Sequence, residues 1–286
     1  MQNHMRGLAT FLGLLCFLLL FSDKAVAQSQ LHVILAADTI SPDIKDDMES
    51  NIYMLIPQFK KQVPEARLKL TVLDKQKLNQ KTILRTIAML NVGADDAIVF
   101  MYCGHGYYED VNQGTFIIPP SDGGGRLYRT TVQKAIQAKQ TRLCVTIFDC
   151  CSVGPNGPPG VPMAPVEQPP TQVSPLFQSL FFNSSGTITM VSSSPGEYAL
   201  CGIPHILNNK VVGLMKGSLF TGELTWLLRE RSNESLRWDE AGNIIRRRVS
   251  QTFKVIAKNG VVTLSDGGRL EQQDQTVVVR INGIPY

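Results

Sequence analysis

Short apolar runs that alternate with amphipathic helical patterns constrain the fold more than any other feature. Residues 31–37 (LHVILAA) form a continuous apolar run, as expected for a strand buried on both faces. Similar runs lie at 67–73, 96–102, 143–148, 187–192 and, as a candidate final strand, 276–281. Apolar residues recur at helical spacing in 46–61, 78–90, 130–139, 220–228 and 238–256. This order predicts an α/β fold with a mostly parallel sheet of about six strands and helices on both faces.

The composition excludes several classes of protein. Of the 286 residues, 43% are hydrophobic and 18% are charged, which excludes a disordered chain. The net charge of +4 is spread along the sequence, so we expect no nucleic-acid partner. Six cysteines are too few for a disulfide scaffold at this length.

Residues 1–27 have the features of a secretory signal peptide. Arg6 makes the start positive, residues 8–21 are apolar, and Ala25-Val26-Ala27 is a small-residue cleavage site. The apolar run is short for crossing about 30 Å of hydrocarbon. We therefore expect a secreted or periplasmic protein with no stable membrane anchor after cleavage. An uncleaved membrane anchor is the alternative.

A proline-rich segment interrupts the alternating pattern. Residues 155–175 contain eight prolines, which excludes a helix or a central strand there. We predict a long surface loop that separates a larger and a smaller half of one domain, residues 28–286.

Two of the predicted strands end in residues with catalytic chemistry. One is followed by Gly104-His105-Gly106 and the next by Asp149-Cys150-Cys151. Sites in open α/β sheets form at the carboxyl ends of the strands, and neighbouring strands lie about 4.8 Å apart. We expect a thiol nucleophile and a proton-transfer partner to share one cleft there. The glycines would let the backbone turn sharply and leave N–H groups facing a developing oxyanion.

These stretches resemble the caspase-like cysteine peptidases, and metacaspases in particular. Metacaspases carry Tyr-Ser-Gly-His-Gly and Asp-Ser-Cys-His-Ser-Gly where this chain has YCGHG at 102–106 and DCCSVG at 149–154. His105 precedes Cys151 by 46 residues, near the spacing of about 50 in caspases. Residues 193–199 and 217–221 resemble landmarks of the family's small half. The resemblance covers roughly 30–260 and implies the caspase–haemoglobinase sandwich.

The resemblance also implies a mechanism. Cys151 matches the nucleophile, His105 the general acid and base, and the backbone N–H groups of Gly106 and Cys151 the oxyanion donors. The implied activity is endopeptidase hydrolysis of a protein or peptide through a thioacyl-enzyme, with no metal or organic cofactor required. Some metacaspases need calcium, but no calcium loop is evident in the sequence. Cys103 and Ser152-Val153 depart from the family pattern, which concerns specificity more than catalysis.

Two aspartates carry the expected substrate specificity. Asp149 and Asp47 match carboxylates that line the pocket for the P1 side chain in metacaspases. A pair of carboxylates would select Arg or Lys by charge complementarity. The alternative is that Asp149 orders its turn and Asp47 caps a helix.

A non-catalytic role is the competing interpretation. His105 would then be an ordinary loop histidine and Cys151 an inert buried thiol. The chain would be a caspase-fold binding or scaffold protein, because a fold alone does not establish an activity. The oligomeric state stays open, although an edge strand could pair in a dimer.

Overall fold

A computed structural model describes residues 29–109, 114–117, 119–122, 125–151, 169–207, 210–258 and 272–286. Within these ranges, residues 108–109, 114–116, 151, 203–207 and 210–215 are described by their backbone alone. The expected signal peptide and most of the proline-rich loop lie outside the described residues. Among the described helices, none combines the length and the apolar character needed to cross a membrane.

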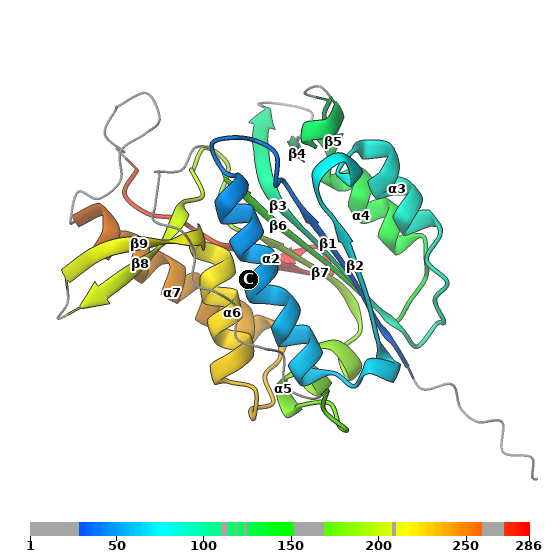
Figure 1. Cartoon of the computed structure of the whole chain (residues 1–286). Helices are drawn as coiled ribbons and strands as arrows, with labels where there is room; N and C mark the ends of the chain where they lie inside the picture. Colours follow the sequence, from blue (N-terminus) through cyan, green and yellow to red (C-terminus); the bar gives the residue numbers. More distant parts are fainter. Residues whose placement is uncertain are drawn as a thin grey trace, which may run out of the picture.

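A mostly parallel sheet forms the centre of the molecule, as predicted (Figure 1). Its main path has the strand order β11-β10-β7-β6-β3-β1-β2, and the five strands from β7 to β2 are parallel. The path is formed by β1 (Leu31–Ala37), β2 (Leu68–Leu73), β3 (Ala97–Glu109), β6 (Leu143–Cys151), β7 (Gly186–Val191), β10 (Val278–Ile281) and β11 (Ile284–Pro285). The short strands β4 (Gly114–Ile117) and β5 (Leu127–Tyr128) extend it from the end of β3.

Helices cover both faces of this sheet (Figure 1). One face carries α2 (Lys45–Gln62), α5 (Pro175–Phe177) with the adjoining η4 (Gln178–Phe182), α6 (Leu219–Glu230) and α7 (Trp238–Lys258). The other face carries α3 (Gln80–Ala88) and α4 (Arg129–Gln137). Short 3-10 turns lie at η1 (Glu65–Arg67), η2 (Lys75–Lys77) and η3 (Pro120–Asp122).

Side-chain alternation along the strands divides the core into two layers. In β1, Leu31, Val33 and Leu35 pack into the layer under α2, α6 and α7, whereas Ile34 and Ala36 pack into the layer under α3 and α4. All five are at most 2% exposed. Fully burying one such aliphatic side chain contributes roughly 1.5–3 kcal/mol, so the continuous apolar run specifies a strand covered on both sides.

The strands that carry His105 and Cys151 are longer than the sequence indicated. β3 runs to Glu109 and β6 runs to Cys151, so both residues lie within strands rather than in the loops after them. The sequence pattern also missed the hairpin of β8 (Cys201–Leu207) and β9 (Lys210–Ser218), which projects beside α6 in Figure 1. Gly202, Pro204 and Gly213 weaken the strand signal there, and the hairpin is irregular in register.

Candidate active site

Strands β3 and β6 bring His105 and Cys151 to the same point of the sheet. The two strands are parallel, and their register pairs Cys103 with Asp149 and His105 with Cys151. Neighbouring strands lie about 4.8 Å apart. The backbones of the expected nucleophile and its proton-transfer partner are therefore adjacent at the carboxyl ends of the strands.

The imidazole of His105 contacts a carboxylate that the sequence pattern did not single out. Its Nε2 lies 3.2 Å from Oδ1 of Asp43. An ionised carboxylate only accepts hydrogen bonds, so Nε2 is the donor, and in the neutral imidazole Nδ1 keeps its lone pair. The side chains of His105 and Asp43 are 23% and 43% exposed. Asp43 therefore fixes the ring tautomer at a position that solvent and substrate can reach.

The loop that carries Asp43 is held in place by Asp38, a fully buried residue. The carboxylate of Asp38 accepts hydrogen bonds from two backbone N–H groups and, at 2.6 Å, from the hydroxyl of Ser41. The backbone N–H of Asp38 donates to the carbonyl of Cys103 at 2.9 Å. The loop is thus tied to β3 two residues before His105.

Gly104 occupies a position where no side chain fits. A Cβ atom there would lie 2.6 Å from the hydroxyl oxygen of Tyr102 and 2.9 Å from Cβ of Asp38. The buried Tyr102 hydroxyl donates to the carbonyl of His105 at 3.0 Å. The expected sharp turn at Gly104 is wrong, because β3 continues through it. The glycine instead permits close packing around the backbone of His105.

Asp149 is fully buried beside Cys103. Its Oδ2 accepts hydrogen bonds from the hydroxyls of Ser218 and, at 2.6 Å, of Thr221. Its Oδ1 is buried, and within the described part of the chain it accepts no hydrogen bond of ordinary geometry. Burial raises the pKa of Asp149, and the nearby hydroxyls of Ser218, Thr221 and Ser192 oppose that rise.

Asp47 reaches the same segment from the first turn of α2. Its Oδ1 accepts the N–H of Gly217 at 2.7 Å, and the residue after Gly217 binds Asp149. The N-cap of α2 is Ile44, so the carboxylate of Asp47 serves a contact between elements instead of capping. Burial raises the pKa of Asp47, while the Gly217 hydrogen bond and the charge of Lys216 lower it.

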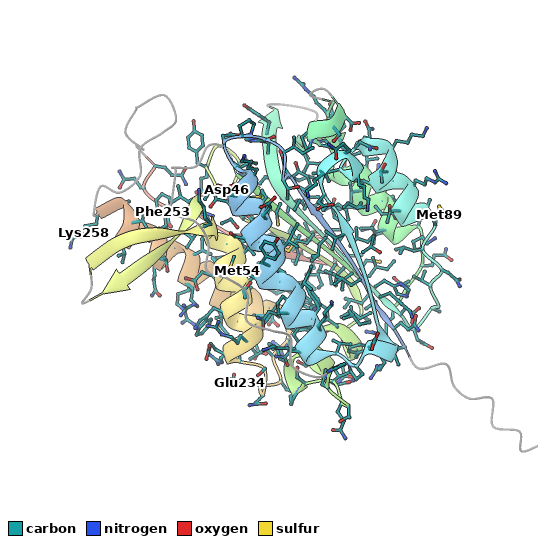
Figure 2. The ribbon with its side chains drawn as sticks, in the orientation of Figure 1. Asp46, Met54, Met89, Glu234, Phe253 and Lys258 are labelled. Carbon is teal, nitrogen blue, oxygen red and sulfur yellow. The ribbon has the colours of Figure 1, made fainter. Side chains whose placement is uncertain are left out.

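Lys216 is the cation nearest to this carboxylate pair. Its Nζ lies 3.4 Å from Oδ2 of Asp46, which Figure 2 labels at the N-terminal end of α2. No ion pair to Asp47 or Asp149 is found within the described ranges. Asp47 and Asp149 are both buried, and they contact adjacent residues of the same β9 segment.

The structure places the backbones of His105 and Cys151 side by side, and it links Asp47 with Asp149 through β9. His105 and Cys151 are register partners, Gly106 follows His105 and pairs with Ile117 of β4, and one dipeptide of β9 links Asp47 with Asp149. The sequence pattern did not single out Asp43 or Asp38. Both belong to Asp-Thr-Ile-Ser-Pro-Asp at 38–43, a stretch of residues typical of turns that directly follows a buried strand. No group of three or more His, Cys, Asp or Glu side chains arranged to hold a metal occurs in the part of the chain that the structure describes.

Comparisons with known proteins identify the family and the fold of the chain. The profile of the Caspase domain matches residues 51–278. Caspase-1 from Spodoptera frugiperda has a similar structure, with a TM-score of 0.55 and 12% identity over 90% of each chain. Pro-sf-caspase-1 gives a TM-score of 0.51 and 13% identity over 90% of this chain and 93% of its own. No match was found among curated proteins. Because the profile spans most of the sequence, the chain belongs to the caspase-domain family.

Proposed function

We propose that this protein is an exported cysteine endopeptidase that hydrolyses peptide bonds with Cys151 and His105. The observation that carries the proposal is the register pairing of these two residues on β3 and β6. The caspase-domain match and the hydrogen bond of His105 to Asp43 support it. Together they supply a nucleophile, a base and a group that orients the base.

The reaction follows from this arrangement. His105 takes the proton of the Cys151 thiol, the thiolate attacks the carbonyl carbon of the scissile bond, and the negative charge moves to the carbonyl oxygen. Backbone N–H groups of Gly106 and Cys151 would stabilise that oxyanion. His105 then protonates the leaving amine. Water attacks the resulting thioester and gives a proton to His105, which returns it to the sulfur of Cys151 as the thiolate leaves.

The carboxylate pair supports cleavage after Arg or Lys. Asp47 and Asp149 are 3% and 0% exposed, and burial raises the pKa of both. A cationic P1 side chain would relieve the unfavourable burial of negative charge, whereas an acidic one would add to it. Oδ1 of Asp149, which has no internal donor of ordinary geometry, is the acceptor best able to bind a guanidinium or ammonium group.

The specificity can be measured with fluorogenic peptides that end in Arg, Lys or Asp. We expect cleavage after Arg and Lys only, with Cys151→Ala as the inactive control. Asp149→Asn should reduce cleavage after Arg by about tenfold or more, because a charge-assisted contact is lost. Preferential cleavage after Asp would contradict the assigned specificity. Calcium should be varied in parallel, because the resemblance to metacaspases leaves a calcium requirement open.

The same specificity limits self-processing. No Lys or Arg occurs between Arg142 and Lys210, so an enzyme that requires a basic P1 residue cannot cut its own loop at 155–175. Mass spectrometry of the purified protein should find any Cys151-dependent cut at or beyond Lys210. A cut within the loop that Cys151→Ala abolishes would remove the proposal of basic specificity.

Export is the part of the proposal that rests on residues 1–27 alone. We expect cleavage after Ala27, which N-terminal sequencing of the protein recovered from the exported fraction would detect. A non-catalytic caspase-fold scaffold is the competing function. That alternative predicts no Cys151-dependent turnover of any peptide, with or without calcium.

A further inference from the structure

A cavity lies on the face of the sheet opposite Asp149. Its volume is about 370 Å³, within the range of small-molecule sites. Phe148 and Cys150 of β6 line it, and both belong to the core layer under α3 and α4. Gly106, adjacent to His105, lines it as well. The cavity thus touches the chain neighbours of both proposed catalytic residues from the side away from the carboxylate pair.

Arg129 is the cavity's most unusual residue. It is 8% exposed, and its Nε is buried with no hydrogen-bond partner. No carboxylate pairs with Arg129 among the residues described, and its guanidinium lies 5.3 Å from the ring centre of Phe148. Burying an arginine without an anionic partner is costly, so an anion is the missing complement.

The cavity presents a second group that favours anions. Arg129 and Thr130 begin α4, a helix of nine residues, and both line the cavity. The N-cap residue Tyr128 makes no side-chain capping hydrogen bond. The first backbone N–H groups of a helix and its dipole attract negative charge. The helix start and the buried guanidinium therefore converge on the same space.

The remaining charges of the cavity are compatible with an anion. Arg280 of β10 adds a second cation to the lining. Glu197 is the acidic residue of the lining, and its carboxylate already accepts hydrogen bonds from the N–H of Ser194 and from the N–H and hydroxyl of Thr276. The carboxylate of Glu197 is thus held by Ser194 of its own loop and by Thr276, and it does not pair with Arg129.

We infer that this cavity binds a small organic anion, with its phosphate or carboxylate group held by Arg129 and the N-terminus of α4. Phe148, Val191 and Val278 form apolar walls that suit the body of such a ligand. The site is separate from the proposed P1 pocket, which lies on the other face of the sheet. Binding here does not require peptidase activity.

Calorimetric titration of the purified protein with inorganic phosphate and with benzoate tests this inference. The Cys151→Ala variant should be used, so that the result is independent of the proposed catalysis, and ionic strength should be held constant against screening. We expect saturable binding of at least one probe in the millimolar range or tighter, and none of benzylammonium. The stronger of the two anions identifies the head group.

Variants locate the site. Arg129→Gln should weaken binding by about tenfold or more, because a charge-assisted contact is lost, whereas Arg85→Gln on the exposed side of α3 should leave it unchanged. Arg129→Lys and Arg280→Gln provide further tests if Arg129→Gln fails to fold, and each should weaken binding measurably. Absence of saturable binding of both anions, or equal binding by wild type and every folded cavity variant, would overturn the inference.

Discussion

Asp43 and His105 are joined by a hydrogen bond of 3.2 Å between Oδ1 and Nε2, although 62 positions separate them in the chain. The bond comes from the loop after β1 and reaches the proposed base at the end of β3. It leaves Nδ1 of His105 available for the thiol and the leaving amine. Asp43 is therefore a positioning residue for the proposed reaction.

Asp43→Asn should lower kcat by about tenfold with a smaller change in KM, because it alters the orientation and charge stabilisation of the imidazole rather than substrate binding. The effect is expected to be moderate because both side chains are partly exposed and solvent screens the interaction. Steady-state kinetics with an Arg-terminated peptide measure it. Glu49→Gln on α2 is the matched control, and an equal loss in that variant would contradict a specific role for Asp43.

Cys151→Ala and His105→Ala should each reduce kcat/KM by at least about a thousandfold, and the double variant should be no worse than either single one. Nucleophile and base act as one unit, so their contributions are not additive. Cys144→Ala is the matched control, because Cys144 lies in the core layer under α3 and α4. Losses that simply multiply in the double variant would show that the two residues do not act in one step.

Asp149→Asn should change how stability depends on pH. Burial raises the pKa of Asp149 in the folded state, so the folded protein keeps this proton at pH values where the unfolded chain has lost it. The contribution of this group to the free energy of unfolding therefore falls as pH rises from about 4 through the raised pKa. Asparagine does not titrate, so the variant should gain stability relative to wild type across that interval.

Urea unfolding at several values between about pH 4 and pH 7 would measure this difference. Glu49→Gln again serves as the control, with no comparable trend expected. A relative stability of Asp149→Asn that stays constant, or decreases as pH rises, would show that the pKa of Asp149 is not raised by folding.

Gly104→Ala should destabilise the protein by roughly 1–3 kcal/mol and reduce activity, because the added methyl group overlaps the Tyr102 hydroxyl and the Asp38 side chain. Relief of that overlap would displace the backbone that presents His105. Gly93→Ala is a suitable control, since its Cβ would lie 3.6 Å from the nearest atom, an ordinary contact. Thermal unfolding and peptide turnover of both variants decide the point; a fully stable, fully active Gly104→Ala protein would refute it.

The sheet and the proximity of the two motifs could be predicted because each rests on a strong local signal. Buried parallel strands are continuously apolar, and carboxyl strand ends of one sheet meet at one edge. The hydrogen bond to Asp43 could not be predicted in the same way. It depends on the exact path of residues 38–43, which hydrogen bonds to the carboxylate of Asp38 determine.

The ends of β3 and β6 could not be predicted for a related reason. Glycine is a poor strand former, so Gly104 and Gly106 indicated the end of β3. In the folded chain the ladder with β6 continues as far as His105 and Cys151, and Gly104 is required by its tightly packed neighbours. The cavity beside Arg129 was equally inaccessible to sequence patterns, because it is built from five separate segments.

The extension of β3 and β6 as far as His105 and Cys151 has a mechanical consequence. The proposed base and nucleophile lie on adjacent rungs of one hydrogen-bonded ladder, so they share the rigidity of two central strands of the sheet. Heat inactivation should then coincide with global melting instead of preceding it, unlike an enzyme whose chemistry depends on a detachable lid.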